Sequence, residues 1–254
     1  MVVIVFENRE ASEIIENRDA PTFAGLARRG ARLEPYTAVA HPSLPNYLAL
    51  VSGSTHGIES DCTDCVVDAP SLADTLHAAG RTWKTYAEGI PRAGFTGAAA
   101  GRYVKRHVPF LYFRSVLSRP SWRRRVQPFS ELERDLAARR LPDFSLVIPD
   151  LCHNMHDCSV AVGDRWLGHA LKILLRSGAL RGGVVFVVFD EGTSTAGGGG
   201  RIAAYAVGPA VRARAQTGEA VTHYRLLATI EAAWRLPRLG RSRSVKPIKG
   251  IWRR

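Results

Sequence analysis

The 254-residue chain lacks any long hydrophobic run, and no stretch approaches the roughly 18 apolar residues of a membrane-spanning helix. Acidic residues are scarce beside basic ones, 23 against 35, which gives a formal net charge of +12. Only 8% of the residues are aromatic, and they do not alternate with basic residues as a stacking surface for single-stranded nucleic acid requires. The sequence therefore offers no candidate membrane span, and its charge alone does not indicate an obligatory nucleic-acid partner.

The composition is that of one folded α/β domain. Hydrophobic residues make up 46% of the chain, enough for a sizeable core, and no linker divides it. The positive charge attracts anions, so phosphate esters and weak association with acidic membrane surfaces fit it. Arginine and lysine concentrate in 119–125, 134–140 and a basic tail at 238–254. Base composition alone is an alternative explanation of this arginine content. Nothing in the sequence indicates an oligomeric state.

Cysteine is rare, and its four copies form two close pairs, Cys62/Cys65 and Cys152/Cys158. Local pairs in even number favour two disulfides of an extracytoplasmic or secreted protein. Free thiols are the alternative. A four-thiolate zinc site is a weaker one, because the second spacing is poor for zinc. The apolar run that follows Met1 does not form a secretory signal peptide.

Apolar runs and helical spacings alternate along the chain. The expected strands are 2–6, 31–39, 82–87, 145–148, 184–189 and 202–207, and the expected helices are 20–29, 43–53, 71–79, 164–177 and 223–236. The irregular, arginine-rich segment 91–140 is interpreted as an insertion or cap within a single domain, 1–254. This alternation predicts an α/β fold with a mostly parallel central sheet and helices on both faces.

Polar residues follow four of the apolar runs directly. In open parallel sheets the ligand site lies outside the carboxyl ends of the strands. The residues at these ends are Glu7-Asn8, His41-Pro42-Ser43, Pro149-Asp150 and Asp190-Glu191. Carboxylates, a hydroxyl and a histidine are thus expected along one edge of the sheet.

The acidic residues at this edge predict a metal site. Asp190 and Glu191 would repel each other unless a cation lies between them. Glu7 and Asn8 add a carboxylate and an amide oxygen from the neighbouring strand end. Such oxygen ligands suit one hard divalent cation, with Ca²⁺, Mg²⁺ or Mn²⁺ favoured over Zn²⁺. An ordinary solvated turn is the alternative for the Asp-Glu pair.

Ser43 is expected at the N-cap of a helix, where free amides and the positive end of the helix dipole favour an anion. A hydroxyl beside a metal is a competent nucleophile, so Ser43 is a candidate for nucleophilic attack as well as a metal ligand. Asn46, one turn later, is placed to bind a phosphoryl oxygen. His41 is a candidate for phosphate binding or proton transfer, and a structural loop role is the alternative. His56 is interpreted as structural.

A second polar cluster lies between Cys152 and Cys158. Its residues are His153, Asn154, His156 and Asp157, with Asp150 just before them. Their density indicates a general acid or a substrate clamp, with a polar surface loop as the alternative. His223, which begins the last expected helix, is a secondary candidate for the same edge.

Several segments resemble the bacterial phosphoesterase family, which includes acid phosphatases and phospholipases C and belongs to the alkaline-phosphatase superfamily. The segments are Val-Phe-Glu-Asn (5–8), His-Pro-Ser-Leu-Pro-Asn-Tyr-Leu-Ala-Leu-Val-Ser-Gly (41–53), Met-His-Asp-Cys (155–158), Phe-Asp-Glu-Gly (189–192) and the run at 223–231. They occur in order over most of the chain, and coverage is weakest at 91–140 and in the tail. The resemblance implies an alkaline-phosphatase-like fold.

The resemblance also implies roles for individual residues. Ser43 would form a phosphoseryl intermediate, and Glu7, Asn8, Asp190 and Glu191 would hold a metal that also touches Ser43. His41, His156 and His223 would surround the phosphoryl or leaving group, with His156 catalytic. Other superfamily members often use two zinc ions with histidine ligands. No such histidine accompanies Asp190-Glu191, and this favours one harder metal.

The chain departs from the family in two places. Where relatives tend to have Asn-Asp before Met-His-Asp, this chain has His153-Asn154, so a carboxylate is absent from the expected substrate loop. A glycine run at 197–200 replaces a more varied polar segment. The expected activity is hydrolysis of an anionic phosphate monoester. A phosphodiesterase or phospholipase C using the same site is the first alternative, and a non-catalytic anion- or nucleic-acid-binding protein is the second.

Overall fold

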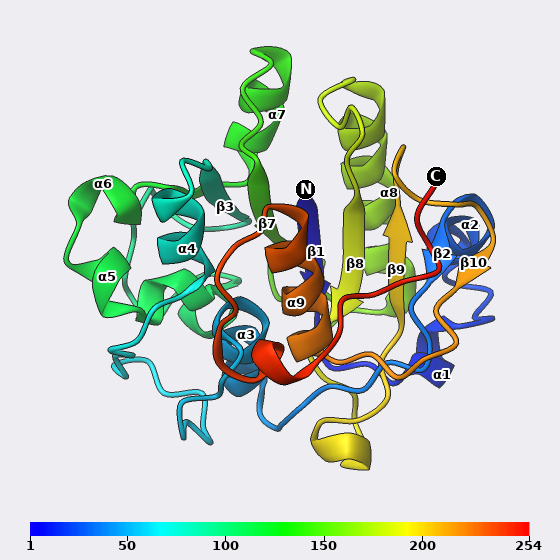
Figure 1. The fold of residues 1–254 in the computed structure, drawn as a ribbon, viewed down its shortest axis with the longest axis horizontal. Helices are drawn as coiled ribbons and strands as arrows, with labels where there is room; N and C mark the ends of the chain where they lie inside the picture. The colour runs from blue at the N-terminus through cyan, green and yellow to red at the C-terminus, as the bar shows by residue number, and fades with distance from the viewer. Residues whose placement is uncertain (254) are drawn as a thin grey trace.

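The central feature of the computed structural model, which describes residues 1–253, is an eight-stranded sheet in the order β10-β2-β9-β8-β1-β7-β3-β6 (Figure 1). The strands are β1 (Val2–Phe6), β2 (Ala31–Arg32), β3 (Trp83–Ala87), β6 (Val126–Pro128), β7 (Phe144–Ile148), β8 (Val185–Phe189), β9 (Ala204–Val207) and β10 (Ala215–Gln216). Strands β8, β1, β7, β3 and β6 run parallel, whereas β9 is antiparallel to both β8 and β2. The predicted α/β fold with a mostly parallel sheet is confirmed.

Helices cover both faces of this sheet. They are α1 (Ala11–Ile14), α2 (Pro21–Arg29), α3 (Ser43–Ser52), α4 (Leu72–Ala78), α5 (Arg114–Leu117), α6 (Pro120–Arg123), α7 (Ser130–Ala137), α8 (Val160–Arg176) and α9 (His223–Ala233). Helices α3 and α9 pack together in front of the sheet in Figure 1, and α2 packs against α8. The three inner strands β1, β7 and β8 are buried along their whole length, as continuous apolar runs predict.

Helix α8 begins at Val160, four residues before the predicted start at Asp164. The reason is that Asp164 does not cap its own helix. Its carboxylate accepts hydrogen bonds from the backbone amides of Thr22 (2.9 Å) and Phe23 (3.1 Å), in the first turn of α2. A buried aspartate thus satisfies the free amides of a neighbouring helix and joins α8 to α2.

The expected extended stretch 31–39 is only partly regular, since β2 comprises two residues. Segment 91–140 contains the small sheet of β4 (Ala99–Ala100) and β5 (Tyr103–Val104), and the 3-10 helices η1 (Lys105–His107) and η2 (Pro109–Tyr112). It also supplies β6, which extends the main sheet beside β3. The side chains of 110–113 are completely buried, so this segment contributes to the core.

Residues 238–254 pack against α9 as far as the structure describes them. The side chain of Glu231, 0% exposed, accepts hydrogen bonds from the Leu239 amide (2.8 Å) and the Ser242 hydroxyl (2.6 Å). Ile248 and Ile251 are buried in the core. Both cysteine pairs form disulfides, Cys62–Cys65 and Cys152–Cys158. Within 1–253, no helix combines the length and apolar character needed to cross a membrane.

Candidate active site

Adjacent strands bring the predicted acidic residues together. Phe6 pairs with Phe189 at the ends of β1 and β8, so Glu7 and Asp190 emerge side by side. Carboxylate oxygens of Glu7, Asp190 and Glu191 all lie within 4.8 Å of one another, and all three residues are buried. The rule that ligand sites form beyond the carboxyl ends of parallel strands therefore locates this cluster correctly.

The Ser43 hydroxyl points into this cluster. Ser43 is the first residue of α3, is 4% exposed, and donates a hydrogen bond from Oγ to Glu7 Oε1 across 2.6 Å. The N-cap is Pro42 rather than Ser43, which corrects the predicted cap. The serine hydroxyl makes no capping bond because the buried carboxylate is its acceptor. A buried serine hydroxyl thus lies against one of three clustered acids.

Burial and mutual repulsion set the ionisation of the cluster. Burial, with the charges of Glu7 and Glu191, raises the pKa of Asp190 well above its ordinary value. Burial and the charge of Glu7 raise the pKa of Glu191 to about 7, although His41 acts against the rise. Burial also acts to raise the pKa of Glu7, but the charge of His107 outweighs it, and with the close contacts to Asp190 and Ser43 the pKa falls to about 2. The surrounding side chains therefore supply too little positive charge to compensate three ionised carboxylates.

Two atoms of the cluster are suited to a cation. Glu7 Oε2 and Asp190 Oδ2 are buried without a hydrogen-bond partner among residues 1–253. Buried carboxylate oxygens without partners are costly unless a cation or donor meets them. Asn8 follows Glu7 in the left-handed region (φ 46°), which asparagine tolerates better than most residues. Its amide donates to Asp190 Oδ1 (3.1 Å) and ties the two strand ends together. The donor set fits a hard divalent ion.

His41 and Asn46 flank Glu191. His41 Nδ1 is 2.9 Å from Glu191 Oε2, and its Nε2 is 2.7 Å from the Ser194 carbonyl oxygen. Asn46 Oδ1 accepts the amides of residues 39 and 40, while its Nδ2 donates to the Ala40 carbonyl (2.7 Å). Asn46 therefore shapes the loop before Ser43 with the amide that was expected to bind phosphate.

The disulfide-closed loop 152–158 contributes to the site from a third strand end, after β7. Asn154 is completely buried; its Oδ1 accepts the His156 amide (2.9 Å), and its carbonyl accepts the Glu7 amide (3.0 Å). His156 and Asp157 are more open to solvent, and His156 Nδ1 is 2.6 Å from Asp157 Oδ1. Asn154 thus supports Glu7 from inside, whereas His156 and Asp157 remain accessible.

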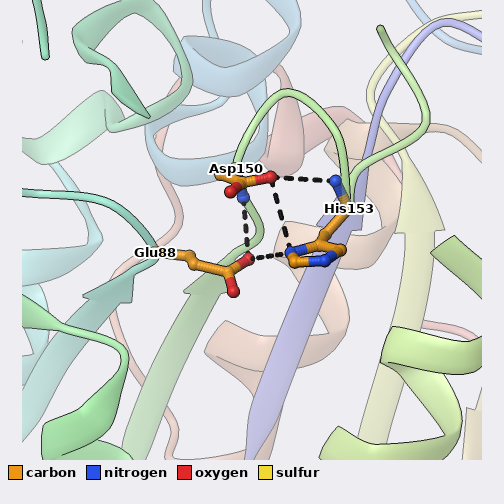
Figure 2. A group of neighbouring side chains, drawn as sticks. All are labelled: Glu88, Asp150 and His153. Carbon is orange, nitrogen blue, oxygen red and sulfur yellow. Dashed lines mark hydrogen bonds and ion pairs between the residues drawn. The ribbon is translucent and has the colours of Figure 1, made fainter. Parts of the chain in front are cut away.

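A second acidic group, Glu88, Asp150 and His153, lies at the base of this loop (Figure 2). Asp150 Oδ1 accepts the amides of Cys152 and His153, both at 2.9 Å. Glu88 Oε2 accepts the Asp150 amide (3.1 Å) and lies 2.9 Å from His153 Nδ1. Figure 2 shows the contacts among Glu88, Asp150 and His153. These hydrogen bonds hold the base of the loop 152–158 in place.

His223 reaches the cluster from α9, as its position suggested, but it contacts the backbone. Its Nε2 is 2.6 Å from the Asp190 carbonyl oxygen, and its Nδ1 is 3.1 Å from the Tyr36 hydroxyl. Burial lowers the pKa of His223 to about 4, although the bond to Asp190 opposes the shift. The neutral ring therefore donates from Nε2 to Asp190 and accepts from Tyr36. It fixes the Asp190 backbone.

Sequence reasoning missed His107, which lies on η1 within segment 91–140. Its side chain is 1% exposed, and its Nε2 is 3.2 Å from Glu7 Oε2. The ring stacks on that of Tyr47, with 5.1 Å between the ring centroids. The rule based on strand ends does not select it, because it follows the two-residue strand β5. Its one sequence signal is its place immediately before the apolar run 108–113, which is unusual for an exposed histidine.

A buried serine against three clustered carboxylates, at the carboxyl edge of a parallel sheet, defines a hydrolase-type site that suits a divalent cation. The Phosphoesterase family matches residues 7–237, and the chain belongs to this family. The reaction class of the chain is therefore hydrolysis of phosphoric esters.

Relatives extend over most of the chain. A phosphatidylinositol-3-phosphatase of Mycobacterium tuberculosis is 34% identical over 99% of this chain and 82% of its own length. A phosphate-repressible acid phosphatase of Penicillium chrysogenum is 30% identical over 85% of this chain, which spans 55% of that protein. A solved alkaline-phosphatase-superfamily protein from Vibrio parahaemolyticus shares the fold, with a TM-score of 0.65, 15% identity, and coverage of 98% of this chain and 70% of that one.

Proposed function

We propose that the chain is a metal-dependent phosphatase that hydrolyses phosphate monoesters through a phosphoseryl intermediate on Ser43. The observation that carries the proposal is the 2.6 Å hydrogen bond from Ser43 Oγ to Glu7, within a cluster of three buried carboxylates. An N-cap serine would turn its hydroxyl to the free amides of its own helix, but Ser43 follows the cap residue Pro42, which leaves another role for its hydroxyl. The hydroxyl is directed at acidic groups that need a cation.

One divalent cation, Ca²⁺, Mg²⁺ or Mn²⁺ in preference to Zn²⁺, would be held by Glu7, Asn8, Asp190 and Glu191, with Ser43 beside it. The unpartnered Glu7 Oε2 and Asp190 Oδ2 support this assignment. The cation would lower the pKa of the serine hydroxyl and offset charge on the phosphoryl group. His223 and the Asn8 amide keep Asp190 in place for this role.

In the first half-reaction Ser43 Oγ attacks phosphorus in line, and the bond from phosphorus to the leaving oxygen breaks as the bond to Oγ forms. Glu7 Oε1 accepts the hydroxyl hydrogen and so orients the attacking lone pair. His156, held by Asp157, gives the leaving oxygen a proton. Water then attacks phosphorus and passes a proton to His156, the bond from phosphorus to Oγ breaks, Ser43 regains its proton from Glu7, and phosphate leaves.

The substrate we propose is an anionic monoester, attracted by a net charge of +12. The phosphatidylinositol-3-phosphatase relative makes phosphorylated inositol headgroups a first class to assay. His41 and Asp157, both partly exposed, are the residues proposed to contact it. The two disulfides support a site of action in an oxidising, extracytoplasmic compartment.

The test compares hydrolysis of p-nitrophenyl phosphate with that of its bis-ester, using chelator-treated protein given back Ca²⁺, Mg²⁺, Mn²⁺ or Zn²⁺ in turn. Metal-restored monoesterase activity that Ser43→Ala lowers by at least about 10³-fold is expected. Ser12→Ala, at an exposed serine on α1, is the matched control. Unimpaired turnover in Ser43→Ala would contradict the proposal, and preferential cleavage of the bis-ester would favour a phosphodiesterase.

A further inference from the structure

A chain of contacts leads from the disulfide-closed loop to the nucleophile and fixes which nitrogen of His107 carries a proton. The His156 amide donates to Asn154 Oδ1 (2.9 Å), which leaves Asn154 Nδ2 as the group 3.3 Å from His107 Nδ1. An amide NH₂ only donates, so His107 Nδ1 must be the acceptor. In a neutral imidazole the ring proton is then on Nε2, the atom 3.2 Å from Glu7 Oε2.

His107 is held in this position by contacts to two different elements. Its ring stacks on Tyr47 with an interplanar angle of 19°, and Tyr47 lies on α3 one turn after Ser43. On the same short helix, Lys105 Nζ donates to the Thr63 carbonyl across 2.7 Å. The imidazole is thus clamped between the nucleophile's helix and the disulfide-closed loop.

Glu7 depends on this histidine for support. Glu7 Oε1 accepts the Ser43 hydroxyl. The nearby side chains of Asp190 and Glu191 are also carboxyl groups, so they bring no positive charge to Glu7. Within residues 1–253, Glu7 Oε2 has no aligned hydrogen-bond donor, and the His107 contact is at ion-pair distance without full alignment. A buried histidine with a purely structural role would be expected to have both ring nitrogens hydrogen-bonded. Here it faces a catalytic-site carboxylate with an unused lone pair.

We propose that His107 is a positioning residue of the active site. Asn154 fixes its tautomer, and the ring holds the Glu7 carboxylate so that one oxygen accepts the Ser43 hydroxyl while the other stays available to the cation. The inference rests on the proposed function, since it gives Glu7 a role in metal binding. It makes segment 91–140 part of the catalytic machinery through a residue outside the short motifs 5–8, 41–53, 155–158, 189–192 and 223–231.

Four variants test the proposal. His107→Leu removes the donor and keeps much of the volume, whereas His107→Gln returns an amide donor. Asn154→Leu removes the tautomer-fixing contact. His77→Leu, at an exposed histidine on α4, is the control. Mn²⁺ affinity of chelator-treated protein is measured by calorimetry, beside kcat, KM and the melting temperature.

We expect His107→Leu to weaken Mn²⁺ binding by about 10- to 100-fold, the usual effect of losing a residue that orients a metal ligand. The loss should fall on kcat more than KM, and His107→Gln should recover most of it. Asn154→Leu should act in the same direction, and the double variant should be no worse than His107→Leu alone. Long-range ¹H–¹⁵N NMR of the wild-type protein should find the His107 proton on Nε2.

The proposal is overturned if His107→Leu binds Mn²⁺ as the wild type does, or if His107→Gln is no better than His107→Leu, because packing then accounts for the residue. A proton on Nδ1 would also overturn it, and this measurement needs no variant to fold. Failure of the proposed function is read separately, as undiminished turnover in Ser43→Ala. Metal affinity in the His107 variants does not depend on turnover.

Discussion

Ser43 and Glu7 lie 36 positions apart in the chain, yet the serine hydroxyl donates to the glutamate carboxylate across 2.6 Å in a buried site. The contact joins the first turn of α3 to the end of β1, two elements that the core fixes on all sides. A hydrogen bond to a charged, buried acceptor is stronger than one between neutral groups and costly to lose. The position of the Ser43 hydroxyl is therefore set by the fold itself.

Glu7→Gln should separate the charge of this residue from its shape. The amide can still accept the Ser43 hydroxyl, but it removes a negative charge from the cation site. We expect metal affinity and kcat both to fall by about 100-fold, within the range for altered metal-site residues. Titration of Mn²⁺ into the apoprotein and steady-state kinetics measure the two effects. Glu16→Gln, at an exposed position, is the control, and an unchanged metal affinity would exclude Glu7 as a ligand.

The pH dependence of stability should reveal the crowded acids. Burial and the charge of Glu7 raise the pKa of Glu191 from 4.5 to about 7, so between these values the folded state holds a proton that the unfolded state has lost. The Glu191 contribution to the free energy of unfolding of the metal-free protein should therefore decrease as pH rises from about 4.5 to 7, whereas His223, whose pKa burial lowers to about 4, contributes in the opposite direction. Urea unfolding across this range measures it. In Glu191→Gln the decrease should be smaller, and an equal decrease in the variant would contradict the assignment to Glu191.

The Cys152–Cys158 disulfide should stabilise both the fold and the site, because it closes the loop whose Asn154 carbonyl accepts the Glu7 amide. Replacing both cysteines by serine should cost about 2 kcal/mol in the free energy of unfolding and weaken Mn²⁺ binding. Replacing Cys62 and Cys65 is the comparison, since that bond closes a loop whose Thr63 carbonyl contacts Lys105 and not Glu7. If the Cys152/Cys158 variant bound Mn²⁺ as tightly as the wild type does, this disulfide would have no role in the metal site.

The parts of the fold that the sequence predicts are those where one local rule dominates. Continuous apolar runs identify β1, β7 and β8, and the residues directly after β1 and β8 identify Glu7, Asp190 and Glu191. Strand β9 is antiparallel to β8 because the segment between them contains only the 3-10 helix η3 (Ala196–Gly198) and no α-helix of the kind that a parallel crossover needs.

His107 could not be predicted in the same way, because its role depends on contacts that span the chain. It meets Tyr47 from α3, Glu7 from β1 and Asn154 from the loop after β7, and no local pattern encodes that meeting. Asn46 and Asn154 show the converse. Their residue type suits phosphate binding, but the Asn46 amide group bonds the loop before Ser43 and lies 3.4 Å from Glu191 Oε2, and the Asn154 amide group contacts His156 and His107. Residue type indicates what chemistry is available, and only packing decides where it is used.

Glu231 should be important for stability and not for catalysis. It is completely buried at the end of α9, and its two carboxylate oxygens accept the Leu239 amide and the Ser242 hydroxyl, which attach the basic segment after residue 238. Glu231→Ala would remove the acceptor of the buried Ser242 hydroxyl and leave the Leu239 amide with Ser242 Oγ alone, so we expect it to cost about 3 kcal/mol in the free energy of unfolding. Urea unfolding measures the loss, with exposed Glu219→Ala as the control.

Because none of these contacts reaches Ser43 or the three clustered acids, kcat below the melting transition should stay within about twofold of wild type. A larger fall in kcat at full folding would show that the basic segment acts on the site itself.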